Sequence, residues 1–304
     1  MQTRLQWIFV TPATQMLRSG WRIGIFCVVT ACFSGLAFLG ANFIIPTSEI
    51  LVAVFLCIGL VGASVVMVTV IDRRPFYSFG IAVRRRFLVE WGQGILIAGV
   101  MMTFIILAFF LTDSLTVENR DSTWLEIGRH LLNGLLLFTF AAFFEELLFR
   151  GYLFQTLVEG TNRTIAIAIF SLFFGLVHLG NPNISVFSVF NIILAGIFLS
   201  LAFLRTGTLW LCTALHLGWN FFQGSVYSLP VSGIVKSDIS ISRIVLTGPE
   251  WFTGGAFGPE GGFAATVVLI IGSIVIWKAP WIKNENPVAT VEAPVPVIID
   301  EVGR

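Results

Sequence analysis

The sequence predicts an all-α protein: a polytopic transmembrane helix bundle of about eight spans, with both termini in the cytoplasm. Of its 304 residues, 56% are hydrophobic and only 12% are charged, whereas a soluble domain carries about 25% charged residues. The mean hydropathy is +0.91, and the apolar residues gather in runs near the length of about 20 residues that a membrane-crossing helix needs. This composition excludes soluble and disordered classes. The net charge of +1 argues against nucleic acid as a partner.

Eight apolar segments are candidate spans. The first follows Arg18 and Arg22 but exceeds the apolar run of a signal peptide, so we expect a retained helix. The fourth is longer than a bilayer requires, and its inner third is more polar. The predicted spans are 23–45, 50–71, 92–112, 127–158, 164–181, 184–204, 208–229 and 263–278.

Three further segments complete the predicted organisation. Residues 1–22 mix aromatic and basic side chains, which is typical of an interfacial amphipathic segment. The membrane domain then covers 23–283, and the tail, 284–304, reads as a disordered cytoplasmic extension. The Gly-rich segment 233–262 is either a flap over a site or, the interpretation we favour from sequence, a long connection.

Basic residues gather in alternate loops. Five arginines follow the second span, Arg163 follows the fourth, Arg205 follows the sixth, and two lysines follow the eighth. Cytoplasmic loops carry such an excess of Lys and Arg. We therefore expect a multi-pass protein of the plasma membrane with its polar site towards the cytoplasm.

The fourth span contains three charged residues, Glu145, Glu146 and Arg150. Each charge near the centre of a membrane helix costs about 2.5–3.5 kcal/mol on insertion scales. Glu146 and Arg150 are four residues apart and can form an ion pair on one helical face. That pair leaves Glu145 without a partner. An adjacent second carboxylate suits a general base, because its neighbour's charge and the low dielectric disfavour ionisation.

Histidines supply the second set of polar groups. His130 lies near the outer end of the fourth span, where interfacial anchoring explains it, whereas His178 and His216 lie inside spans. Each could be a core histidine bonded to a neighbouring helix. Asn220 follows His216 by four residues, so the two share a face. Counted from the helix turns at about 1.5 Å per residue, Glu145 and His178 lie level, and His216 joins them if the hairpin of spans four and five extends about 10 Å into the cytoplasm.

A carboxylate, two imidazoles and an amide around a wet cavity suit the activation of water for attack on an amide. The same imidazoles, with a carboxylate, could instead hold a divalent metal such as zinc. The sequence has no HExxH, GxSxG or GxGD motif, which excludes the zincin, serine-elbow and intramembrane aspartyl mechanisms.

Three motifs in order, EExxxR, FxxxH and HxxxN, resemble the CAAX-protease and bacteriocin-processing family, also called the ABI family. The resemblance is strong over residues 125–225, our candidate protease core, and weaker over 70–125. Ser200 departs from the family, in which many members have a glycine at that position. The motif residues here are Glu145, Glu146, Arg150, Phe174, His178, His216 and Asn220.

The resemblance implies a membrane-embedded endopeptidase of the type II CAAX prenyl endopeptidase kind, acting on a peptide or protein at the bilayer. It implies that Glu145 activates water and that Glu146, held by Arg150, supports it. His178, His216 and Asn220 would complete the site, with the two histidines as ligands if a metal is present. The alternative is a non-catalytic immunity or maturation partner that binds peptides through the same cluster.

Overall fold

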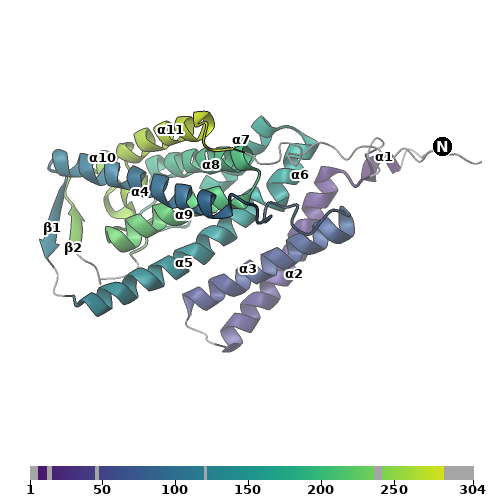
Figure 1. The fold of residues 1–304 in the computed structure, drawn as a ribbon, viewed down its shortest axis with the longest axis horizontal. Coiled ribbons are helices and arrows are strands. Elements are labelled where there is room, and N and C mark those ends of the chain that lie inside the picture. The colour runs from purple at the N-terminus through teal and green to yellow at the C-terminus, as the bar shows by residue number, and fades with distance from the viewer. Residues whose placement is uncertain (1–5, 12–15, 45–47, 120–121, 236–241, 284–304) are drawn as a thin grey trace, which may run out of the picture.

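The computed structural model describes residues 6–11, 16–44, 48–119, 122–235 and 242–283 (Figure 1). Helices dominate this part of the chain, as predicted. Their bounds are α1 Gln6–Phe9, α2 Ser19–Ile44, α3 Glu49–Val66, α4 Phe87–Leu111, α5 Trp124–Arg150, α6 Tyr152–Gly160, α7 Arg163–Val177, α8 Val186–Thr206, α9 Leu209–Phe221, α10 Glu250–Thr253 and α11 Phe263–Lys278. Two π-helical turns, Met67–Ile71 and Phe222–Val226, extend α3 and α9, and two 3-10 turns, Gly255–Phe257 and Pro259–Gly261, precede α11.

A small β-ribbon is the one departure from an all-α class within the described residues. β1 (Leu115–Asn119) and β2 (Ser242–Leu246) pair antiparallel, with Val117 opposite Ile244. The short β-branched runs in both segments favour strands. The ribbon joins the connection after α4 to the long segment before α11.

Each predicted span coincides with a helix, but the lengths differ. In the described residues, five segments are long and apolar enough to cross a membrane: those of α2, α3, α4, α5 with α6, and α8. α7 and α11, at 15 and 16 residues, are shorter apolar helices. α9 has 13 residues before it passes into a π-helical turn. The predicted span 164–181 is therefore too long, because α7 ends at Val177, just before the Gly180–Pro182 turn.

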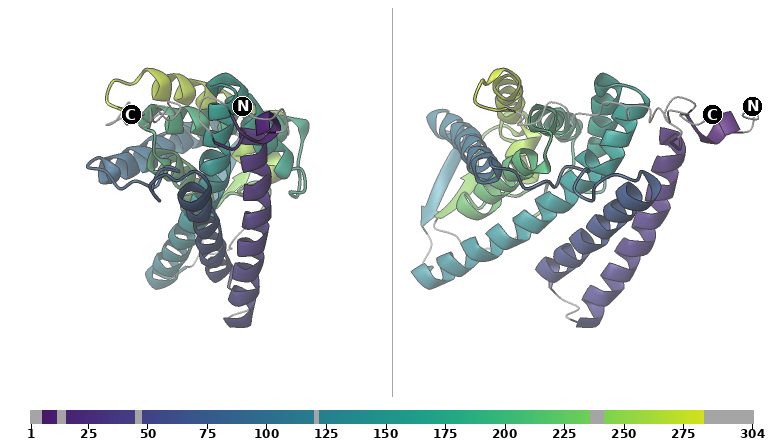
Figure 2. Two further views of the ribbon diagram at one scale, coloured as in Figure 1. Left: turned by 90° about the vertical axis from the view of Figure 1, so that its right-hand side faces the viewer. Right: turned by 45° about the vertical axis from the view of Figure 1, so that its right-hand side comes forward.

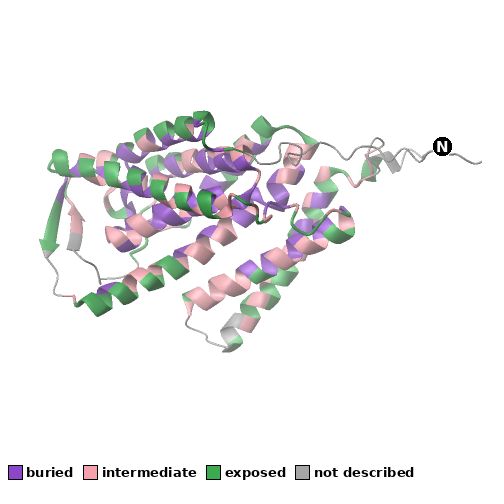
Figure 3. Ribbon diagram, viewed as in Figure 1, coloured by how far each residue is buried: buried purple, intermediate pink, exposed green. Residues whose placement is uncertain are grey.

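Helix α9 lies at the centre of the bundle (Figure 1). It packs against α4, α5 and α8, while α7 and α11 cover α8. Ten of its thirteen residues are buried, and the outer helices carry most of the exposed surface in Figure 3. Close approach of α4 depends on glycine, since a Cβ at Gly94 would lie 2.5 Å from the Cβ of Ala214.

The α2–α3 hairpin stands to one side of this bundle, as the views in Figure 2 show. It contacts the bundle through α3 on α5 and through α2 on α6. A cluster of ion pairs joins the end of the hairpin to α6. Arg22 pairs with Asp72 and, at 2.5 Å, with Glu159 of α6. Glu159 also pairs with Arg74. The pairing offsets the cost of removing these charges from water.

The long fourth span is divided at Gly151, where α5 ends and α6 begins in a new direction (Figure 1). A Cβ at Gly151 would lie 2.1 Å from the carbonyl oxygen of Leu147. The bend therefore requires glycine. It leaves Glu145, Glu146 and Arg150 in the last two turns of α5.

Candidate active site

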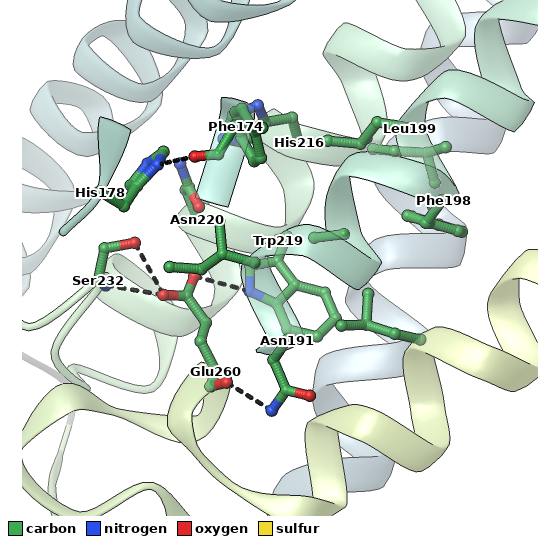
Figure 4. Close-up of a pocket in the computed structure, with 14 residues that line it drawn as sticks. Phe174, His178, Asn191, Phe198, Leu199, His216, Trp219, Asn220, Ser232 and Glu260 are labelled. Carbon is green, nitrogen blue, oxygen red and sulfur yellow. Dashed lines mark hydrogen bonds between the residues drawn. The ribbon is translucent and has the colours of Figure 1, made fainter. Parts of the chain in front are cut away.

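A cavity lies between α7, α8, α9 and the segment before α11 (Figure 4). The space that the centres of water molecules can occupy inside it is about 60 Å³. Such a volume holds a few waters, at about 10–15 Å³ each. His178, His216 and Asn220 line one side of it together with Trp219, Ser232 and Glu260. The opposite wall is apolar and consists of side chains from α8, α9 and α11: Ile192, Ala195, Phe198, Leu199, Leu215 and Leu269.

His216 connects the cavity to the two glutamates of α5. Its Nδ1 lies 2.9 Å from Oε1 of Glu146, a hydrogen bond, and its Nε2 lies 3.9 Å from Oε2 of Glu145. Glu146 is fully buried, whereas the Glu145 side chain is 30% exposed. One imidazole therefore stands between two carboxylates, one bonded to it and one beyond hydrogen-bond reach.

Arg150 fixes the position of Glu146. Its Nη1 donates to both carboxylate oxygens, at 2.9 and 3.0 Å, so the predicted ion pair is present. Nη2 donates to the carbonyl of Gly196, and Nε reaches the hydroxyl of Ser200 at 3.4 Å. At the position where this sequence departs from the family pattern, the Ser200 hydroxyl therefore contacts the guanidinium. The Phe174 ring lies 4.9 Å from the guanidinium carbon, a cation–π contact.

His178 caps the C-terminus of α7 and is oriented by Phe174. Its Nδ1 lies 2.7 Å from the carbonyl oxygen of Phe174, which can only accept, so Nδ1 carries a hydrogen. In the neutral ring, Nε2 is then an acceptor. The Phe174 ring meets His178 edge-on at 4.9 Å and His216 at 6.1 Å. Phe174 therefore touches three of the predicted site residues.

The structure brings together most of the residues predicted from the motifs, with one difference. His178, His216 and Asn220 share the cavity, as the i,i+4 spacing of the last two predicts. Neither Glu145 nor Glu146 lines it; both lie beyond His216. Within the described residues, Oε2 of Glu145 is buried without a hydrogen-bond partner. Glu145, His178, His216 and Asn220 were predicted to lie at one depth in the bundle. In the structure they gather around His216, but Glu145 lies outside the cavity wall.

Sequence reasoning missed four polar residues of the cavity. Trp219 donates from Nε1 to Oε1 of Glu260 at 3.0 Å. Ser232 donates to the other oxygen, and Asn191 donates to the Glu260 carbonyl at 2.8 Å. Burial raises the pKa of the Glu260 carboxyl above its usual value, against the opposing hydrogen bonds from Ser232. The segment 233–262, expected as a connection, therefore supplies part of the cavity wall; its Gly-rich composition was the only signal.

Across the described ranges, no three His, Cys, Asp or Glu side chains are grouped so as to hold a metal ion. The Nδ1 atoms of His178 and His216 are hydrogen-bonded, which leaves Nε2 of each ring as the nitrogen that could bind a metal. A divalent metal held by the two histidines therefore stays a prediction.

Comparison with known proteins relates this cavity to a family. Residues 127–222 match the family model described as Rce1-like, type II CAAX prenyl endopeptidase Rce1-like. No curated protein matches the chain significantly. The matched region runs from the first turn of α5 to the end of α9 and contains every motif residue of the site. Residues 127–222 are therefore similar to the Rce1-like type II CAAX prenyl endopeptidases, a family of CAAX-type intramembrane proteases.

Proposed function

We propose that this protein is an intramembrane endopeptidase that hydrolyses a peptide bond with water activated by Glu145. The observation that carries the proposal is the position of His216. Its imidazole lies between the ion-paired Glu146 and an oxygen of Glu145 that has no hydrogen-bond partner among the described residues. His216 also lines the cavity, together with His178 and Asn220. A buried carboxylate oxygen without a partner is costly, and a base awaiting a water and a substrate accounts for it.

In the proposed reaction, the scissile bond lies at the His216 side of the cavity. The Glu145 carboxylate takes a proton from water while the water oxygen attacks the carbonyl carbon, and the carbonyl electron pair moves to oxygen. Asn220 supplies N–H donors to that oxyanion at any pH. The carbon–nitrogen bond then breaks, and the amine leaves with the proton held by Glu145.

Glu146 and Arg150 have a supporting role in this proposal. The Glu146 carboxylate, fixed by Arg150, accepts from Nδ1 of His216. This holds the imidazole with Nε2 towards Glu145, as a buried carboxylate orients the histidine of a catalytic triad. A protonated His216 would also donate from Nε2 to the oxyanion.

The cavity favours one kind of substrate. Its apolar wall of α8, α9 and α11 side chains suits an apolar side chain next to the scissile bond. The basic loops favour a cytoplasmic location for the α5–α6 end of the bundle, so we infer that peptides reach the site from that side. A plasma-membrane location is part of the same proposal.

The test is cleavage of a fluorogenic peptide library, with prenylated and unprenylated C-terminal peptides as separate arms, by detergent-purified protein. Glu145→Gln should abolish cleavage while thermal unfolding stays near that of wild type. Glu126→Gln is the matched control, because Glu126 lies on the same helix but caps its other end through Thr123. Retained cleavage by Glu145→Gln would contradict the proposal.

Two further outcomes separate the alternatives. Cleavage should survive a strong zinc chelator; loss of activity that zinc alone restores would favour a metalloprotease with His178 and His216 as ligands. If no peptide is cut and a cellular phenotype survives Glu145→Gln, the protein is a non-catalytic binding partner.

A further inference from the structure

Glu260 is the centre of a hydrogen-bond network outside the family-matched region. Its Oε1 accepts from Nε1 of Trp219 at 3.0 Å, and its Oε2 accepts from the backbone N–H and the hydroxyl of Ser232, at 2.8 and 2.9 Å. Its carbonyl accepts from Asn191. Figure 4 shows the carboxylate reaching between Ser232 and Trp219. One side chain thus joins the segment before α11 to α9 and to the turn that follows the Phe222–Val226 π-helical turn.

The turn that Glu260 holds is tight and strained. Val231 and Ile234 exchange both backbone hydrogen bonds, at 3.0 and 2.9 Å, and Ser232 and Gly233 between them have φ of 49° and 82°. Positive φ at both central residues is the geometry of a type I′ turn, which is unfavourable for serine. Asn181 also donates to the carbonyl of Ser232, at 3.1 Å. External contacts therefore keep Ser232 in this conformation.

The same turn borders two cavities. Ser232 lines the cavity with the histidines. Ile234 and Val235 line a second one of about 660 Å³, which is also bordered by the start of α3 and the N-terminal half of α5. The Val231–Ile234 segment and the residue after it therefore contribute to the walls of both cavities.

We propose that Glu260 is a positioning residue for the reaction, holding the Val231–Ile234 turn and Trp219 as the outer wall of the catalytic cavity. This inference rests on the proposed peptidase function. Trp219 precedes Asn220 on α9 and lies one turn beyond His216, so a shift of its ring moves the residues that orient the scissile carbonyl. Displacement of catalytic groups by about 1 Å can lower a rate 10²-fold.

The polarity of the network gives a sharp test. All three hydrogen bonds to the Glu260 side chain come from donors, so an ionised carboxylate satisfies them all. The amide of Glu260→Gln has one acceptor oxygen and one NH2 group. The NH2 group must face either the indole N–H of Trp219 or the backbone N–H of Ser232, and two donors then oppose each other. Trp219→Phe removes one donor, so in the double variant the introduced amide can turn its oxygen to Ser232.

The experiment combines peptide-cleavage kinetics with thermal unfolding of wild type, Glu260→Gln, Trp219→Phe and the double variant. We expect Glu260→Gln to lower kcat about tenfold with KM changed less than about threefold. In the double variant, kcat and the unfolding temperature should be no lower than in Trp219→Phe alone. Glu250→Gln, a substitution of an exposed glutamate ten residues earlier, is the matched control and should behave as wild type.

Failure of this inference differs from failure of the proposed function. Additive effects of the two substitutions on unfolding, or an unchanged kcat in Glu260→Gln, would overturn the positioning role while leaving the peptidase intact. A wild type that cuts no peptide contradicts the proposed function. The comparison of unfolding temperatures among the wild type, the two single variants and the double variant needs no substrate, and it then decides the role of Glu260 in the cavity wall.

Discussion

Nδ1 of His216 is hydrogen-bonded to Oε1 of Glu146 at 2.9 Å, and this bond directs the other ring nitrogen towards Glu145. Adjacent glutamates therefore have different environments. Glu146 is fully buried and ion-paired, whereas Glu145 is partly exposed, with one oxygen that has no hydrogen-bond partner in the described structure. We expect their substitutions to separate stability from activity.

Glu146→Gln should destabilise the protein by about 3–5 kcal/mol, because it leaves the Arg150 guanidinium buried without its counter-ion. Glu145→Gln should leave stability nearly unchanged. Thermal unfolding in one detergent compares the two. A second variant, Glu146→Leu with Arg150→Met, should recover much of the loss, because it removes both charges; no recovery would contradict the ion-pair explanation.

Asn220 should contribute mainly to the transition state. Asn220→Asp keeps the size of the side chain but replaces N–H donors with acceptors, so kcat should fall by about 10²–10³ with little change in KM. Steady-state kinetics on one cleaved peptide measures this. Asn133→Asp is a control on the outer half of α5, outside the catalytic cavity. Equal losses in both variants would argue against an oxyanion role.

Arg22 should be essential for the attachment of the α2–α3 hairpin. Its guanidinium is buried between Asp72 and Glu159, so Arg22→Gln leaves buried carboxylates with one cation fewer and should cost about 3 kcal/mol or more. Arg163→Gln, at an exposed position, should cost less than about 0.5 kcal/mol. Equal unfolding temperatures for the two variants would show that the cluster contributes little.

Gly233→Ala should disturb the cavity wall. The residue has a φ of 82°, and a Cβ there would lie 2.0 Å from the carbonyl oxygen of Pro182, so the turn must move. We expect lower stability and lower kcat. Gly92→Ala is the matched control: its Cβ would meet no atom within 4 Å, and alanine favours the helix by about 0.5–1 kcal/mol. A stable, active Gly233→Ala would contradict a fixed wall.

Local spacing explains what the sequence could predict. The Glu146–Arg150 pair and the shared face of His216 and Asn220 follow from helical periodicity, and both are present. The position of Glu145 relative to the cavity could not be predicted, because it depends on the rotation of α5 against α9.

Contacts between distant segments were beyond sequence reasoning. Glu260 lies about forty residues after Trp219 in a Gly-rich segment that has no periodic pattern. Arg22 and Glu159 were each visible as charges, but nothing in their spacing indicates that one meets the other. The interfacial segment 1–22 and the tail 284–304 stay predictions; the tail lies outside the described residues.

The central position of α9 has a consequence for how the protein is made. Helix α9 contains His216 and Asn220, and polar side chains of this kind are costly in contact with lipid, so α9 depends on protein neighbours for its place in the membrane. The helices that surround it, α4, α5 and α8, all precede it in the chain. During synthesis from the N-terminus, α9 therefore leaves the ribosome after its neighbours, and it can enter a slot that they have already formed.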